Sequence, residues 1–457
     1  MEYGGVGEMG RFTNCYNSRN IEEPWQVGKD RLKASTVCKQ WRSCLFHKDL
    51  WSNRTLIVKT GRMKKSRQTA QLIGRYLGRI TIDFEAQNFA AVLCTLKILE
   101  ITSRSTNLRC LTFKPTSCHI SLPPTQYQVI NQLIERLMEI TLNTRKLQHL
   151  SLGCITEFCE KSAEIVYSLG QHHANTLHSL HVASVRENPQ ISNVGQPLNG
   201  LCTFKMLQIL SVDYDQLSNE ILKSLSSNPV TLKQLNLHVH NIDFDKRIIS
   251  KESWRVLISK CKNLQVNCSV LHSENAASRL KDIIPSFVPL VTLRLLFNGY
   301  LTSSLLNYLG SHSNTLKYLD IIDGIDETPR IYSEPQYGVP DPLIMLAYLC
   351  TNLRRLTIIG YLILDEYIIG ISRLRRKTLK SLLVPQCCIG ITGEAMDNNV
   401  FDMKPYDENF NSEISYTLKT DWSPLQDYEL HPSIVDPMAD AETAYLHLLL
   451  SDQKMCV

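Results

Sequence analysis

The fold is decided by a phrase that returns along the chain, and its clearest copy is Leu147-Gln-His-Leu150-Ser-Leu152. The pattern is Leu-x-x-Leu, one further residue, and then Leu, Ile or Val. The first leucines of successive copies lie 30 residues apart from 147 to 177 and 25 apart from 207 to 232. Further copies begin at Leu290, Leu316, Leu353 and Leu379, and a plausible first copy begins at Leu108. The phrase therefore marks a structural unit that repeats along most of the chain.

Each copy predicts a short β-strand with one buried face. The second leucine and the last apolar residue are two positions apart, so a strand points both side chains to the same side. One copy cannot bury that face alone, whereas stacked copies form a continuous core. The spacing is close to that of leucine-rich repeats, roughly 20–29 residues. We therefore predict an α/β leucine-rich repeat solenoid over residues 108–392.

Helix-like stretches alternate with the predicted strands. Residues 128–142 (QVINQLIERLMEITL) place apolar side chains at helical spacing, and similar stretches occur at 218–225, 254–261, 301–309 and 343–350. The alternation predicts a horseshoe with strands on the concave face and helices on the convex face. An ordinary α/β domain also alternates strands and helices, but it does not repeat the Leu-x-x-Leu spacing so often.

A second feature lies before the repeats, in residues 30–51. It contains Asp30-Arg31, Ala34-Ser35, Val37-Cys38-Lys39, Trp41 and Leu50-Trp51. Residues 32–45 also have the pattern of a short amphipathic helix. The segment resembles the second half of an F-box, a helical docking motif. A helix that only caps the first repeat is the alternative interpretation.

The resemblance implies a role in ubiquitin transfer. F-box proteins with leucine-rich repeats act as substrate receptors of SCF-type ubiquitin ligases, in which the F-box binds the Skp adaptor on a cullin scaffold and the repeats bind the protein substrate. It implies a non-catalytic subunit. Cysteines expected to be buried free thiols suit the reducing cytoplasm or nucleus. The candidate adaptor-binding residues are Leu32, Val37, Cys38, Trp41, Leu45, Leu50 and Trp51.

One departure from the family pattern concerns residues 1–29. An F-box opens with Leu-Pro and an acidic, apolar helix, and this segment is instead rich in Gly and Asn. The alternative function is therefore a leucine-rich repeat scaffold or competitive regulator that does not bind the Skp adaptor. The expected organisation is an atypical or disordered tail (1–29), a partial F-box (30–60), a linker and N-terminal cap (61–107), the repeats (108–392) and a C-terminal cap or tail (393–457).

The candidate substrate-binding residues follow from the strand pattern and from the inserts. Side chains that alternate along each strand with the buried apolar residues of the repeat are expected on the concave face. Inserts at 187–198 and 324–342 are loops on a rigid scaffold, where binding residues are common. In the C-terminal tail, Trp422 either packs on the last repeat or contacts substrate. The candidates are His149, Ser151, His181, Ser211, Asn236, Asp320, Tyr332, Tyr337 and Trp422.

Composition narrows the remaining classes of function. The net charge of +5 is mild, and basic runs such as 62–67 and 373–377 are not interleaved with aromatic residues, so nucleic-acid binding is not expected. The 15 cysteines include no C-x-x-C pair and no zinc-type cluster. Gly5-Val-Gly7-Glu-Met-Gly10 fits G-x-G-x-x-G, but no strand precedes it, so no dinucleotide cofactor is expected. Cys261 and Cys350 precede rung leucines and are expected to be buried thiols. No apolar stretch reaches the ~20 residues of a membrane span.

Overall fold

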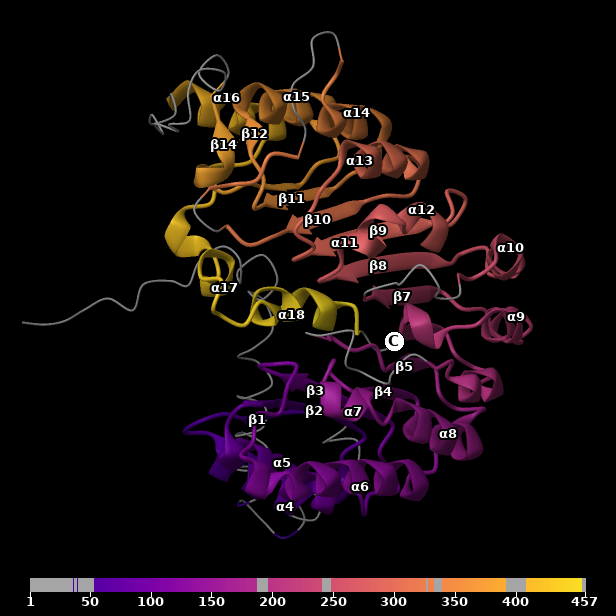
Figure 1. Cartoon of the computed structure of the whole chain (residues 1–457). Coiled ribbons are helices and arrows are strands. Elements are labelled where there is room, and N and C mark those ends of the chain that lie inside the picture. Colours follow the sequence, from indigo (N-terminus) through magenta and orange to yellow (C-terminus); the bar gives the residue numbers. More distant parts are fainter. Residues whose placement is uncertain are drawn as a thin grey trace, which may run out of the picture.

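The computed structural model describes residues 36, 39, 53–186, 196–240, 248–325, 328–332, 339–391 and 408–453. Among these residues, twelve strands form one sheet in which each strand lies beside its neighbour in the chain. Every pair in the sheet is parallel. Figure 1 shows the strands stacked into an arc, with helices such as α9 and α10 along its outer side. The predicted α/β leucine-rich repeat solenoid is confirmed.

The strands are short in most repeats, as the phrase predicts. The sheet contains β1 (Asn53–Val58), β2 (Arg79–Phe84), β3 (Cys110–Pro115), β4 (His149–Ser151), β5 (Ser179–His181), β6 (Ile209–Asp213), β7 (Gln234–Val239), β8 (Gln265–Leu271), β9 (Leu290–Leu296), β10 (Tyr318–Ile322), β11 (Arg355–Ile359) and β13 (Ser381–Leu383). A two-stranded sheet pairs β12 (Ile363–Leu364) with β14 (Ile389–Gly390).

Helices connect the strands. They are α4 (Met63–Ile73), α5 (Phe89–Thr102), α6 (Gln128–Asn143), α7 (Thr156–Cys159), α8 (Ser162–His173), α9 (Asn219–Ser226), α10 (Lys251–Lys260), α11 (Glu274–Ser278), α12 (Leu280–Ile283), α13 (Ser303–Leu309), α14 (Pro342–Leu349), α15 (Asp365–Arg375), α16 (Glu408–Leu418), α17 (Pro432–Val435) and α18 (Glu442–Ser451). Short 3₁₀ turns occupy Gly74–Tyr76, Pro124–Gln126, Asn199–Thr203, Tyr214–Gln216, Gly310–His312, Gln386–Cys388 and Asp427–Glu429. None of the helices among the described residues is long and apolar enough to cross a membrane.

The core is a column of aliphatic side chains between the sheet and the outer helices. The register places Leu111, Leu150, Leu180, Leu210 and Leu235 side by side on consecutive strands, and all five are buried. The first leucine of each phrase is buried as well and packs from the turn before its strand. Each repeat thus covers the apolar face of the next one.

The sheet begins earlier than the leucine phrase. Residues 61–107, where we expected a linker and N-terminal cap, contain β2, α4 and α5, and β1 precedes them from residue 53. These two strands continue the same parallel pairing, since Leu56 lies beside Ile82 and Ile82 beside Phe113. Their buried residues are mostly Ile, Val and Phe in strict alternation. For this reason a search for Leu-x-x-Leu does not detect them.

The C-terminal end of the sheet is closed by residues 408–425. Trp422 packs edge-on against Phe410 of α16, with ring centroids 5.7 Å apart. Its indole Nε1 donates a 2.9 Å hydrogen bond to the Leu382 carbonyl of the last strand, and Leu425 forms a parallel bridge with Pro385. The chain then turns back along the solenoid through α17 and ends its described part in α18.

Two glycines with positive φ give a matched test of this backbone. Gly153 (φ +69°) follows β4, and a Cβ there would lie 2.7 Å from the Phe113 carbonyl oxygen, whereas Gly61 (φ +79°) has open space around it. We expect Gly61→Ala to cost about 1 kcal/mol of unfolding free energy from backbone strain alone. Gly153→Ala should cost about 2–4 kcal/mol because the clash adds to the strain. Urea unfolding of both variants checks this, and equal losses would contradict the geometry.

Candidate functional site

The concave face carries rows of polar side chains that the parallel register brings together. Ser151, His181, Ser211, Asn236 and Asn267 lie beside one another on strands β4 to β8. They alternate along each strand with the leucines of the core, so they point to the opposite side of the sheet. Neighbouring residues of this row are about one repeat apart in the sequence. The stacking of the repeats brings them into direct contact.

Hydrogen bonds join this row into a ladder. His181 Nδ1 lies 2.6 Å from Ser211 Oγ, and its Nε2 lies 2.8 Å from Ser179 Oγ. Asn236 Nδ2 donates to Ser211 Oγ at 2.7 Å, and Asn267 Nδ2 donates to Asn236 Oδ1 at 2.9 Å. The side chains therefore satisfy much of one another's hydrogen-bonding capacity without an added ligand.

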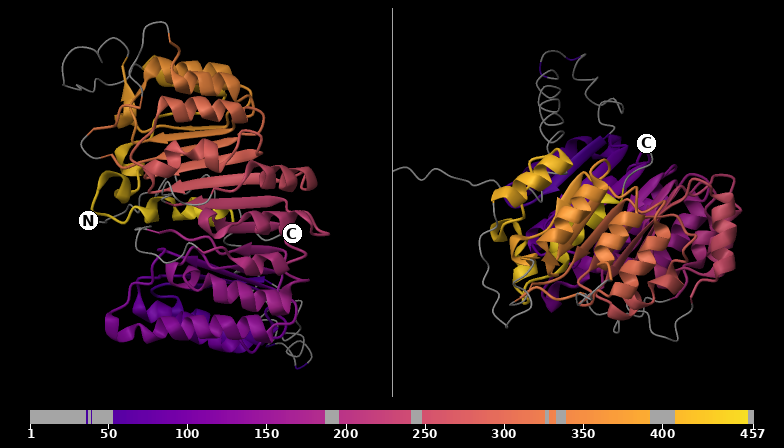
Figure 2. Two further views of the ribbon diagram at one scale, coloured as in Figure 1. Left: turned by 45° about the vertical axis from the view of Figure 1, so that its right-hand side comes forward. Right: turned by 90° about the horizontal axis from the view of Figure 1, so that it is seen from above.

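The C-terminal helix α18 lies across this face. Figure 1 shows it on the side of the sheet opposite α9 and α10, level with the middle strands, and the view from above in Figure 2 places it within the arc. Gln453 accepts a hydrogen bond from Ser151 and donates to Cys154 Sγ. Asn236 donates to the Asp452 carbonyl at 3.4 Å. Residues more than 200 positions apart in the chain thus meet on the concave face.

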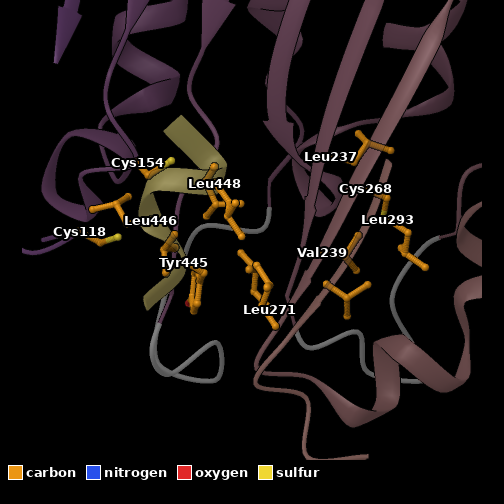
Figure 3. Packing of buried hydrophobic residues seen from close by; sticks show 14 of the residues in the cluster. Cys118, Cys154, Leu237, Val239, Cys268, Leu271, Leu293, Tyr445, Leu446 and Leu448 are labelled. Carbon is orange, nitrogen blue, oxygen red and sulfur yellow. The ribbon is translucent and has the colours of Figure 1, made fainter. Parts of the chain in front are cut away.

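Apolar contacts accompany these polar ones. Tyr445, Leu446, Leu448 and Leu449 of α18 are buried. Figure 3 shows Tyr445, Leu446 and Leu448 near Cys118 and Cys154 on one side and Leu271 on the other. Tyr445 Oη also lies 2.7 Å from His272 Nε2. The helix is therefore bound by both its apolar side chains and its polar end.

Charged groups lie on the concave side of β9 to β11. Arg294 contacts the Asp452 carboxylate through Nη1 and Nη2 at 2.5 and 3.2 Å, and its Nε lies 3.6 Å from Asp320. Arg355 donates two hydrogen bonds to Asp320, at 2.8 and 2.7 Å, and Thr357 donates a third at 2.9 Å. Paired guanidinium and carboxylate groups of this kind make strong, directional contacts.

A second buried charge cluster follows β5 and β6. Arg186 donates to Asp213 at 2.8 Å and to Asp215 at 2.8 and 3.2 Å. Ser184 donates to Asp213 through both its backbone amide and its hydroxyl group. Burial alone would raise the pKa of Asp213, but His240 at 3.5 Å and Arg186 together hold that pKa below its ordinary value. The cluster is a structural ion-pair network that fixes two neighbouring turns.

The candidate residues from the sequence fall into three groups. His149, Ser151, His181, Ser211, Asn236 and Asp320 lie on the concave face as expected, but all are buried rather than exposed, because α18 and neighbouring side chains cover them. Tyr332 is also buried and donates to Asp341 at 2.8 Å. Trp422 lies in the core at the end of the sheet, which places its ring away from the surface.

The remaining candidates lie outside the described residues. These are Tyr337 and the candidate adaptor-binding residues Leu32, Val37, Cys38, Trp41, Leu45, Leu50 and Trp51. Of the docking segment, the structure describes only Thr36 and Lys39, whose side chains are exposed.

Sequence reasoning missed α18 as part of this site. Its apolar composition (AYLHLLL) indicated a short helix, and nothing in it indicated the partner. One signal was available: six of the ten residues of the helix are apolar, including the run Leu448–Leu450, and such a helix needs a surface to cover it.

The described cysteines are free and mostly buried. Cys261 and Cys350 lie under their repeats as expected, and burial raises the pKa of Cys350 to about 11. Within the described ranges, no group of three or more His, Cys, Asp or Glu side chains is placed to hold a metal ion. The concave face therefore offers shape, hydrogen bonds and charge for binding a protein segment.

Comparison with known proteins adds to this geometry. No family model matches the chain. The chain is 24% identical over 474 residues to F-box only protein 33 of Mus musculus, covering 89% of this chain and 82% of that protein. It is also 24% identical over 468 residues to F-box only protein 33 of Homo sapiens, with the same coverage. These similarities support an F-box protein with leucine-rich repeats.

A comparison with solved structures finds the leucine-rich repeat-containing protein LegL7 from Legionella pneumophila. The similarity covers 80% of this chain and 96% of that one, at 13% sequence identity and a TM-score of 0.31. The leucine-rich repeat architecture of this chain rests on its own parallel sheet and register, described above, and not on this neighbour.

The buried Asp213 cluster should be sensitive to loss of one charge. Asp213→Asn leaves Arg186 buried with a weaker partner, which should cost about 3–5 kcal/mol of unfolding free energy. Glu413→Gln is the matched control because its partner Arg373 is largely exposed, and such pairs contribute about 1 kcal/mol or less. Chemical unfolding of both variants gives the comparison, and a loss below 1 kcal/mol for Asp213→Asn would disprove the structural role.

The contact between His272 and α18 should depend on pH. Burial, with a smaller contribution from the nearby His240, lowers the pKa of His272 to about 4. The unfolded chain, with a histidine pKa of about 6.5, binds this proton first, so the stabilisation is complete above about pH 6.5 and is lost as the pH falls toward 4. His272→Gln should flatten the plot of melting temperature against pH between about pH 6.5 and 4. If the variant showed the same pH profile as the wild type, His272 would not be the cause of the pH dependence.

Proposed function

We propose that the chain is the substrate-recognition subunit of an SCF-type ubiquitin ligase. The observation that carries the proposal is its similarity, over 89% of its length, to two proteins named F-box only protein 33. The resemblance of residues 30–51 to the second half of an F-box gives a candidate site for the Skp adaptor. The solenoid gives a rigid support for a protein substrate, and its edges carry loops suited to recognition.

In this role the chain does no bond chemistry of its own. The F-box segment attaches it to the Skp adaptor and, through the adaptor, to the cullin scaffold. The solenoid holds a substrate so that one of its lysines stays at high effective concentration near the ubiquitin-loaded enzyme. Ubiquitinated substrate then passes to the proteasome. The free thiols fit the reducing cytoplasm or nucleus that the proposal requires.

The test is co-purification with a Skp adaptor. We expect the full chain to elute with the adaptor in size-exclusion chromatography. The double variant Trp41→Ala, Leu45→Ala should lose most of the adaptor, because the two are apolar positions at near-helical spacing in the sequence of the proposed docking segment. The matched control is Lys64→Ala, Gln68→Ala, two truncations on the exposed side of α4.

Co-elution of the wild type and the control, but not of the docking variant, would support a receptor. Absence of a complex with the wild-type chain would contradict the proposal and favour the alternative, a leucine-rich repeat scaffold or competitive regulator without adaptor binding.

A further inference from the structure

The C-terminal segment, residues 442–453, occupies the place on the solenoid that would otherwise be its open concave face. Its anchors spread across six strands: Gln453 contacts Ser151 of β4, and Asp452 contacts Asn236 of β7 and Arg294 of β9. A single segment thus covers the middle of the sheet, which is where an external segment would find the most contacts.

The surface beneath α18 combines apolar side chains such as Leu271 with a large share of polar ones, and that polar share is unusual for an interface that is never exposed. Permanently covered faces of a core are mostly apolar, because a buried polar group must be paired. Here the covered face carries Ser211, Asn236, Asn267 and Arg294. The ladder from His181 to Asn267 pairs these groups with one another, so most of them would keep partners if α18 left.

The hydrogen bonds and ion pairs described between α18 and the solenoid lie toward the two ends of the segment, and buried apolar side chains such as Leu446 and Leu449 hold the part between them. Tyr445 meets His272 near the start of the helix, and Asp452 and Gln453 hold its end. Arg294 keeps its neighbour Asp320 at 3.6 Å without Asp452. Departure of the segment would therefore leave Arg294 and Arg355 beside Asp320 and would expose a surface of paired polar groups and a smaller number of apolar side chains.

The chain geometry permits such a departure. Residues 435–438 between α17 and α18 are exposed and include a turn, and they follow the point where Ile434 accepts a hydrogen bond from Ile325. The segment beyond this turn contributes no strand to the sheet. Movement about residues 435–438 can separate α18 from the sheet while every strand keeps its register.

We propose that residues 442–453 are an intramolecular ligand of the concave face, displaced by a partner segment of the same chemistry. That segment is a helix with aliphatic and aromatic side chains, followed within a few residues by a carboxylate that Arg294 receives. The proposal rests on the proposed function only in naming the partner as the substrate. Because a tethered segment competes at high effective concentration, the free chain binds a partner weakly until the segment is released.

The first measurement is hydrogen exchange of the full wild-type chain by mass spectrometry. Backbone amides of residues 442–453 should exchange at least about tenfold faster than those of β7 and β8, because local opening needs less free energy than unfolding of the sheet. Equal protection of the helix and the strands would show that α18 belongs to the cooperative core and would overturn the proposal.

The second measurement uses a fluorescent peptide of residues 440–453 (DAETAYLHLLLSDQ) as the probe. In the full-length variant Asp452→Lys, the tethered segment meets Arg294 with like charge, so the peptide should bind about tenfold or more tighter than to the wild type. The matched control is Asp421→Lys, the same charge change at an exposed position, and it should behave as the wild type. A second peptide, with lysine in place of the aspartate that corresponds to Asp452, should not bind the Asp452→Lys chain.

Each result decides the question. Equal peptide affinities for folded Asp452→Lys and Asp421→Lys would overturn the proposal, and so would an Asp452→Lys chain that cannot fold, since the segment would then be indispensable to the solenoid. Neither readout involves the Skp adaptor, so failure here is distinguishable from failure of the proposed function.

Discussion

The structure depends on the burial of one column of aliphatic side chains. Each strand places at least one of them on the helix side of the sheet, and the parallel register sets Leu111, Leu150, Leu180, Leu210 and Leu235 next to one another. No single repeat can shield such a face, so the free energy of burial is gained only when neighbours stack. The arc, the outer helices and the exposed turns are consequences of that stacking.

The same alternation creates the other face of the sheet. If leucines occupy every second position on one side, the intervening residues must line the concave side, and here they are Ser, His, Asn, Asp and Arg. Side-chain hydrogen bonds along the strands and ion pairs between Arg355, Asp320 and Arg294 satisfy much of their polarity. A face prepared in this way can be covered or solvated at moderate cost, which suits a surface that binds other chains.

Sequence reasoning reached the solenoid and the row of residues on its concave face. It failed at two places for physical reasons. Strands β1 and β2 use Ile, Val and Phe where the search relied on leucine, although alternation buries all these residues equally well. The row from Ser151 to Asp320 was expected to be exposed, and it is buried because Gln453 and Asp452, about 300 and 130 residues further along the chain, fold back onto it.

The sequence by itself determined the repeat, its α/β character and the side of the strand on which each residue lies, because these depend on local spacing and on the two-residue period of a strand. Only the tertiary structure decided which residues are accessible. The position of α18 follows from the sum of its contacts with strands as far apart as β4 and β9, and no local pattern in residues 442–453 encodes it. Arg294 and Asp452 are 158 residues apart. Their ion pair can form only after the solenoid has folded and the chain has returned across it.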